Sequence, residues 1–196
     1  MRPKFSSNDE LVNYLVRQGR IRSDIVEGAF RRVDRREFVP DEQSEKAYVD
    51  APVPINGVTI SAPHIVAEVT ELLELSGDEK VLEVGSGSGY QAAILGELAK
   101  KVVGVEIDEE LAENSREKVP ENVEIRTGNG FEKVNESFDS ILFSCAADSF
   151  NEAENYIKDD GIIVGPVSED GGQVLKKWKN GELSSHGKVR YVEMQG

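Results

Sequence analysis

A glycine-rich turn between two short apolar runs constrains the fold of this chain more than any other feature. The first apolar run, residues 81–84, is followed by a turn over residues 85–89 in which three glycines alternate with serines. A helix-forming stretch begins at Tyr90, and the second apolar run ends at Glu106. This order of strand, glycine turn, helix, strand and acid is typical of doubly wound α/β folds, where the acid commonly binds both ribose hydroxyls.

The spacing of the glycines argues against a dinucleotide as the ligand. A dinucleotide turn needs the pattern G-x-G-x-x-G, and Tyr90 occupies the position of its third glycine. The pattern instead predicts a small adenosine ligand that carries an amino acid, namely S-adenosyl-L-methionine. A turn without any ligand is the plainer alternative, but three glycines in five residues would cost it backbone entropy that only a close approach justifies.

The predicted cofactor site lies beyond the carboxyl ends of the parallel strands. Glu83 precedes the turn and is placed to bind the ammonium group, and Glu106 is placed to bind the ribose. The side-chain amide of Asn129 could bond the adenine edge, although residues 127–130 also read simply as a good turn, and Glu106 as a solvated acid. The predicted cofactor-binding residues are Glu83, Gly85, Ser86, Gly87, Gly89, Glu106, Ile107, Asn129 and Gly130.

The order of strand and helix signals predicts one α/β domain over residues 1–196. Residues 1–60 are expected to form N-terminal helices and a substrate loop, and residues 61–196 the cofactor-binding core. Before the core we expect a helix capped by Ser7, a helix with Ile25 on its inner side, a kinked loop over 50–57 and a helix over 62–75 capped by Ser61. Strands are expected at 80–84, 101–106, 122–126, 139–145 and 161–166, helices at 90–99, 109–118 and 149–157, and a hairpin over 174–194 that turns at Asn180-Gly181.

This alternation predicts a doubly wound, mostly parallel sheet of the Rossmann-like type. The hairpin adds an antiparallel strand at the C-terminal end, and the first helices form an N-terminal extension.

Charge and cysteine content limit the partners. The chain has 37 Asp and Glu against 23 Lys and Arg, a formal net charge of −14, so we expect no nucleic-acid partner. The acids are spread along the chain, which suggests a surface suited to high salt. No apolar run reaches the roughly 20 residues that span a membrane, no signal-peptide core follows the N-terminus, and Cys145 has no partner for a disulfide. We therefore expect a cytoplasmic protein, a monomer, with Cys145 in its core.

Residues 58–64 lie before the sheet and contain further candidates. Taken alone, Ser61 reads as a helix cap, and His64 as a surface or packing histidine. Two histidines and one cysteine are too few for a zinc site, so no metal is expected.

The chain resembles the protein-L-isoaspartate O-methyltransferase family from about residue 10 to 195. The block at residues 59–64 (TISAPH) is much more specific to that family than the glycine turn, which most methyltransferases share. Further matches lie at residues 36–40 (REFVP), 47–48, 52–55 (PVPI), 82–93, 138–139, 165–167, 173 and 189–192.

The resemblance implies a repair enzyme that methylates L-isoaspartyl and D-aspartyl residues of damaged proteins. It implies that the Ser61 hydroxyl lies at the methyl-transfer centre and that Thr59 and Ile60 contact the substrate, with His64 in the same substrate-binding group. The chemistry agrees, because a sulfonium methyl is already activated and a carboxylate is already ionised at pH 7. Alignment and exclusion of water then suffice without a general base.

Two alternatives stay open. The family usually has Gln at the position of Val58, Asp at that of Asn129 and Gly at that of Ser168, and this chain ends soon after Val192. These departures favour either a related methyltransferase with another acceptor, such as a small molecule, another protein side chain or RNA, or a catalytically silent protein that binds S-adenosyl-L-methionine.

Overall fold

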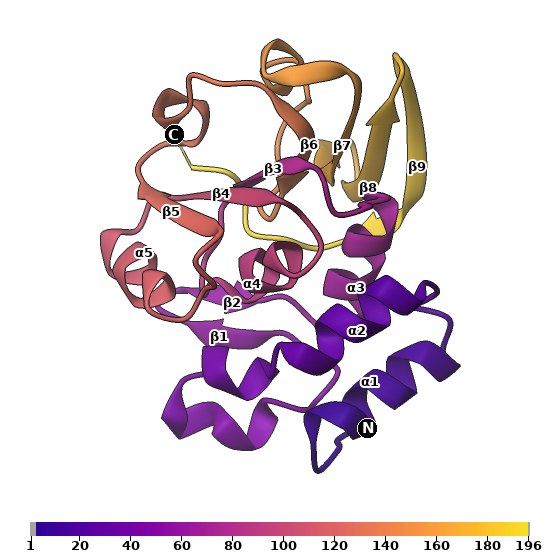
Figure 1. Ribbon diagram of the computed structural model, residues 1–196, viewed down its shortest axis with the longest axis vertical. Coiled ribbons are helices and arrows are strands. Elements are labelled where there is room, and N and C mark those ends of the chain that lie inside the picture. Colours follow the sequence, from indigo (N-terminus) through magenta and orange to yellow (C-terminus); the bar gives the residue numbers. More distant parts are fainter. Residues whose placement is uncertain (1–2, 196) are drawn as a thin grey trace.

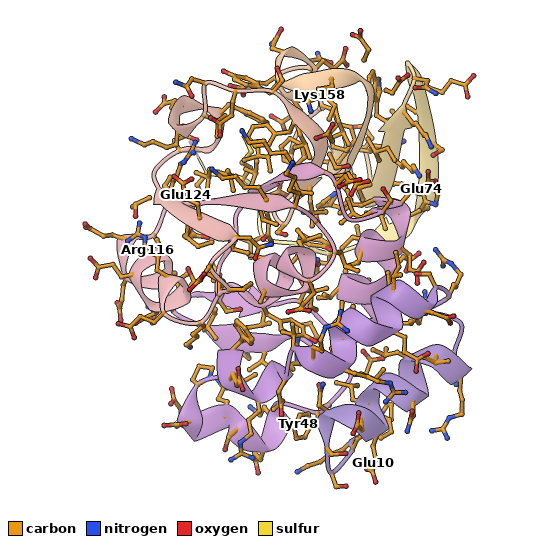
Figure 2. All side chains as sticks on the ribbon, viewed as in Figure 1. Glu10, Tyr48, Glu74, Arg116, Glu124 and Lys158 are labelled. Atoms are coloured by element: carbon orange, nitrogen blue, oxygen red, sulfur yellow. The ribbon has the colours of Figure 1, made fainter. Side chains whose placement is uncertain are left out.

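Figure 1 shows the computed structural model, which describes residues 3–195. Over this range one sheet contains the strands β3 (Lys80–Val84), β4 (Lys101–Glu106), β5 (Val123–Thr127), β6 (Phe138–Phe143), β7 (Ile157–Glu169), β8 (Gly172–Lys179) and β9 (Glu182–Val189). Their order across the sheet is β5-β4-β3-β6-β7-β8-β9. Strands β3 to β7 pair in parallel, and β8 and β9 are antiparallel to their neighbours.

The strand order reverses between β3 and β6. From β3 the chain proceeds outward through β4 and β5, and it then returns to place β6 and β7 on the other side of β3. The helices α4 (Tyr90–Gly96) and α5 (Glu109–Arg116) make the first two crossovers. The predicted doubly wound, mostly parallel sheet is therefore confirmed, and its crevice lies at the carboxyl ends of β3 and β6.

Successive strand residues enter two different apolar clusters because side chains alternate between the faces of a sheet. On β3, Val81 belongs to a cluster that also contains buried residues of the helices α1 (Asn8–Arg17), α2 (Asp24–Arg32), α3 (Pro63–Leu72), α4 and α5. The N-terminal helices and the sheet therefore share one core. The next residue, Leu82, faces the opposite side, where Phe131 of a short 3-10 helix and Phe150 of a loop belong to the same cluster. Within residues 3–195, we find no helix with the length and apolar character that crossing a membrane requires.

The predicted helix over 149–157 is wrong. Only a short 3-10 helix, η4 (Ala153–Asn155), forms there. Phe150 and Ala153 are the buried residues of this segment and lie three positions apart, so a single turn places both against the sheet. The polar residues between them are exposed.

The predicted kinked loop over 50–57 is also wrong, because a hairpin forms instead. Strands β1 (Val53–Ile55) and β2 (Val58–Ile60) pair antiparallel. Asn56 and Gly57 turn between them with φ of 35° and 78°. An Asn-Gly pair suits such a turn, and an exposed proline is tolerated on an edge strand, so the turn outweighs the prolines.

Two expectations about the N-terminal helices are wrong as well. Helix α3 begins at Pro63 with Ala62 at the cap position, so Ser61 is not its cap. Proline fits the first helical position because its missing N–H would have no partner there. Ile25 is 53% exposed rather than inward-facing. Ser7, by contrast, caps α1 as predicted, its hydroxyl accepting from the Glu10 N–H.

The C-terminal hairpin turns at Asn180-Gly181 as predicted, but its second strand lies earlier than expected. Strand β9 ends at Val189, and residues 190–195 run as an extended segment past the carboxyl ends of the strands. Figure 1 shows this segment crossing from β9 toward the side of β5. The Ala146 N–H donates to the Val192 carbonyl and the Met194 N–H donates to the Ala146 carbonyl, each at 2.8 Å. We call residues 190–195 the C-terminal segment.

Candidate functional site

A cavity of about 280 Å³ opens at the carboxyl ends of the central strands. The glycine turn, the ends of β4, β5 and β6, the β1–β2 hairpin and the C-terminal segment line it. We call it the glycine-turn cavity. The predicted cofactor residues that line it are Gly85, Gly87, Glu106, Ile107, Asn129 and Gly130.

The glycine turn presents bare backbone to this cavity. The Gly85 N–H donates to the Val105 carbonyl at 2.8 Å, which ties the turn to β4. Gly87 has a φ of +52°, and a Cβ placed on it would meet nothing within 4 Å, so open space lies beside its main chain. Gly89 has a different surrounding, since its Cβ would lie 3.0 Å from the Ser115 Cβ. Gly89 thus allows α5 to pack closely and does not line the cavity.

Ser86 turns its side chain toward Gly104 on β4. Its hydroxyl is buried and has no partner within the described residues.

Glu106 closes the turn from the end of β4. Glu106 is 7% exposed, and its carboxylate Oε2 accepts a hydrogen bond from the Gly87 N–H at 2.7 Å. The other oxygen accepts from the Asp108 N–H at 3.0 Å. Because each carboxylate oxygen can accept a second hydrogen bond, Glu106 can still receive a hydroxyl from the cavity.

Glu83 is a fully buried acid one strand away. Its Oε1 accepts from the Ser144 hydroxyl at 2.6 Å, and its Oε2 has no partner within the described residues. Burial raises the pKa of Glu83 to about 8; the Ser144 hydrogen bond acts against this rise and the Glu106 charge adds to it. A cationic group beside Oε2 would supply the missing partner and stabilise the carboxylate.

Asn129 and Gly130, from the turn after β5, also line the glycine-turn cavity. Asn129 precedes the 3-10 helix η3 (Gly130–Lys133). The Gly128 N–H donates to the Glu106 carbonyl at 2.8 Å, so this turn is held against the end of β4. Asn129 is therefore among the residues that line the cavity, and its role toward the adenine edge stays a prediction.

A second cavity of about 340 Å³ lies beyond the β1–β2 hairpin, and Thr59, Ser61 and His64 are among its lining residues. We call it the Ser61 cavity. A small space of about 40 Å³ joins the two regions, lined by Ser61, Glu83, Gly87 and others. Thr59 and Ser144 line all three spaces. The structure thus brings the two predicted halves of the site together at these two residues.

Ser61 lines the Ser61 cavity and does not cap helix α3. Tyr191 lines the same cavity. Burial raises the pKa of Tyr191 above its ordinary value, and the hydrogen bond with Ser61 acts against that rise. Ile60, which is buried, contributes to the joining space.

His64 is oriented by Asp50. The Asp50 Oδ1 accepts from the His64 backbone N–H at 3.0 Å and lies 2.7 Å from its Nδ1. Burial acts to raise the pKa of Asp50, but the hydrogen bonds from the His64 ring and backbone outweigh it and hold this pKa below its ordinary value. The ring therefore has a fixed position on the wall of the Ser61 cavity.

Several site residues escaped sequence reasoning. The strand predicted over 139–145 ends at Phe143, so Ser144 and Cys145 lie at its carboxyl edge and line the glycine-turn cavity. A predicted strand that ended at Phe143 would have identified both residues as candidates for the site. Cys145 is half-buried rather than in the core, and burial raises its thiol pKa to about 12, which argues against a nucleophilic thiolate. Tyr191 and the C-terminal segment gave no local signal.

No group of His, Cys, Asp and Glu side chains in residues 3–195 is arranged to hold a metal ion.

Comparison with known protein families finds one matching model over nearly the whole chain. Residues 6–196 match the model described as protein-L-isoaspartate(D-aspartate) O-methyltransferase. A protein-L-isoaspartate O-methyltransferase of Dictyoglomus turgidum is 40% identical over 208 aligned positions, covering 99% of this chain and 94% of that protein. One of Ignicoccus hospitalis is 42% identical over 180 positions, covering 86% and 85%.

The fold agrees with solved structures. A Plasmodium falciparum crystal structure assigned as a protein-L-isoaspartate O-methyltransferase superposes with a TM-score of 0.85 at 27% identity, covering 97% of this chain and 99% of that one. That protein was crystallised in complex with S-adenosyl-L-homocysteine.

Proposed function

The chain belongs to the protein-L-isoaspartate(D-aspartate) O-methyltransferase family, and on that premise we propose that it methylates the free carboxylate of isoaspartyl residues in damaged proteins. The methyl donor is S-adenosyl-L-methionine. One observation carries the assignment of roles: Thr59 and Ser144 border both the glycine-turn cavity and the Ser61 cavity. A donor held in the first cavity and an acceptor held in the second would meet there.

The residues of the glycine-turn cavity fit the donor. Gly87 leaves open space beside its backbone. Glu83 lines the small joining space rather than this cavity, and its buried oxygen lacks a partner that an ammonium group would provide. Glu106 can accept ribose hydroxyls, and the Asn129 amide can bond the adenine edge. When bound, S-adenosyl-L-methionine supplies a methyl group already activated on a sulfonium.

The residues of the Ser61 cavity fit a carboxylate acceptor. We assign to the Ser61 hydroxyl the donation of a hydrogen bond to the acceptor carboxylate, and to Thr59 and Ile60 the main-chain contacts that position the peptide. His64, held by Asp50, lines the route of entry. An aspartyl-type carboxylate is ionised at pH 7, so positioning and exclusion of water replace a general base.

The test is the identity of the product. The protein is incubated with S-adenosyl-L-methionine and a peptide containing one isoaspartyl residue, and the peptide is analysed by fragmentation. We expect a single methyl ester on the isoaspartyl carboxylate, which closes to a succinimide and releases methanol at mild alkaline pH. A stable methyl group on another atom would support a different acceptor. Binding of the cofactor without any turnover would support a catalytically silent protein.

We also propose that the protein works as a monomer in the cytoplasm without a nucleic-acid partner. The net charge of −14 and the single cysteine support this proposal. Light scattering at working concentration checks the monomer.

A further inference from the structure

The two cavities carry opposite charge. Among the residues that line the glycine-turn cavity, the charged ones are the acids Glu106, Asp108 and Glu193. Among those that line the Ser61 cavity, the fully charged ones are the bases Lys188 and Arg190. This separation occurs in a chain where acids outnumber bases by 37 to 23, so a basic cavity runs against the overall composition.

Lys188 and Arg190 lie at the end of β9 and directly after it, two residues apart in extended chain. Alternate residues of an extended segment share a face, so both charges reach the same mouth. Both side chains are exposed, and within residues 3–195 neither takes part in an ion pair.

Two carboxylates near this cavity already have hydrogen-bond partners. The two oxygens of Glu193 accept from Ser168 Oγ at 3.0 Å and from Gln173 Nε2 at 2.7 Å. Asp50 accepts from His64. The charges of Lys188 and Arg190 at the mouth of the Ser61 cavity are therefore exposed to solvent and to a ligand that enters the cavity.

We propose that Lys188 and Arg190 select isoaspartyl sites whose neighbouring residues are acidic. The inference rests on the proposed function and specifies which acceptors that same site prefers. An acceptor carboxylate must approach a protein of net charge −14, and a local positive mouth lowers the barrier to that approach. Acidic neighbours of the damaged residue would contact the same two side chains, and basic neighbours would be repelled.

The experiment uses three isoaspartyl hexapeptides that differ only in the two residues flanking the isoaspartyl, which are Glu, Gln or Lys. kcat/KM is measured at 50 mM and 500 mM KCl. At the lower salt we expect the Glu-flanked peptide to exceed the Lys-flanked one by about tenfold, and at the higher salt by less than about threefold, because exposed charges are screened.

Three variants locate the effect. Lys188→Gln combined with Arg190→Gln should reduce the ratio to within about twofold, and Lys188→Glu with Arg190→Glu should invert it. The matched control, Lys100→Gln with Arg17→Gln, removes the same charge from positions that line neither cavity and should keep the wild-type ratio.

Equal kcat/KM for the three peptides on the unaltered protein would overturn the proposal. The proposal would also be overturned if the ratio of kcat/KM between the Glu-flanked and Lys-flanked peptides stayed unchanged in the double glutamine variant, or fell equally in the control. The Gln-flanked peptide separates the two levels of inference. If the Gln-flanked peptide is methylated and the three peptides have equal kcat/KM, the proposed function stands and the proposed selection is wrong. If no peptide is methylated, both proposals are wrong.

Discussion

Ser61 borders both the Ser61 cavity and the space that joins it to the glycine turn. Its hydroxyl does not cap a helix, because Ala62 occupies the cap position of α3. A substitution there should therefore separate catalysis from stability.

We predict that Ser61→Ala lowers kcat by about tenfold or more, as expected for one lost hydrogen bond to a charged acceptor, and leaves the melting temperature unchanged. Ser7→Ala is the matched control, since Ser7 does cap α1. That variant should lose about 1 kcal/mol of unfolding free energy and keep its kcat. Full activity in Ser61→Ala, or an equal loss of stability in both variants, would contradict the assignment.

Glu83 should make the stability of the cofactor-free protein depend on pH. Its pKa is about 8 in the folded state, raised by burial from 4.5. Between these values the folded protein holds a proton that the unfolded chain has lost, so stability falls as pH rises from about 4.5 to about 8. We predict that Glu83→Gln removes much of this fall in thermal unfolding between pH 5 and 8.

The control for Glu83 is Glu121→Gln, an exposed acid in a loop. Its stability curve should run parallel to that of the unaltered protein. Cofactor binding to the unaltered protein should also release a proton near pH 7, because a cationic ligand favours the carboxylate. Parallel curves for Glu83→Gln and the unaltered protein would show that Glu83 is ionised in the empty site.

The sequence allowed prediction of those site residues that directly adjoin an apolar run. Glu83, Glu106 and Asn129 lie at or next to strand ends, and the strand pattern was clear enough to place them. Prediction of Ser144 would have needed the correct end of β6, and prediction of Tyr191 would have needed the path of the C-terminal segment. Lys188 and Arg190 reach the site through the pairing of β9 with β8; the Asn180-Gly181 turn predicted that hairpin, but its second strand was expected later in the chain.

At the level of elements, the C-terminal segment forms one wall of the glycine-turn cavity. Residues 192–195 line it, and Gln173 fastens the segment by accepting from the Tyr191 N–H at 2.6 Å and donating to the Tyr191 carbonyl at 3.1 Å.

We predict that removal of residues 192–196 weakens binding of S-adenosyl-L-homocysteine by at least about tenfold in calorimetry, through loss of enclosure. The unfolding free energy should fall by only about 1–2 kcal/mol, because few backbone hydrogen bonds are lost. Gln173→Ala, which loosens the same segment, should give an intermediate loss of affinity. Unchanged affinity after truncation would mean that the segment does not enclose the ligand.

The elements that departed from prediction share a physical reason. Local propensity disfavoured a strand at Pro54, yet the Asn56-Gly57 turn and the burial of Val53 and Ile60 made a hairpin. Residues 149–157 had helical propensity, but one short turn already buries Phe150 and Ala153. In the hairpin a favourable turn and burial together outweighed the prolines, and in the second segment burial outweighed helical propensity.

At the scale of the whole molecule, the alternation of strands and helices predicted the doubly wound sheet, and the cofactor half of the site was expected at the carboxyl ends of its strands; the strand order and its reversal between β3 and β6 come from the structure. The acceptor half could be located only through the family resemblance, because Thr59 to His64 precede the sheet in sequence. Their position depends on how the N-terminal helices pack on one face of the sheet.

The net charge of −14 leads to a prediction about salt. Repulsion among dispersed surface acids destabilises the compact state, and salt screens it. We predict that the unfolding free energy rises steadily with KCl into the molar range. A variant with Glu109, Glu110 and Glu113 changed to Gln should show a shallower rise. A flat response in the unaltered protein would remove the case for adaptation to high salt.

The central claim is that two adjoining cavities bring a methyl donor and an isoaspartyl carboxylate together at Thr59 and Ser144. The most direct test compares kcat/KM for methyl transfer to an isoaspartyl peptide and to its aspartyl twin of the same sequence. We predict rapid transfer to the isoaspartyl peptide and none measurable to the twin. Equal transfer to both, or transfer to neither while the cofactor binds, would contradict the account.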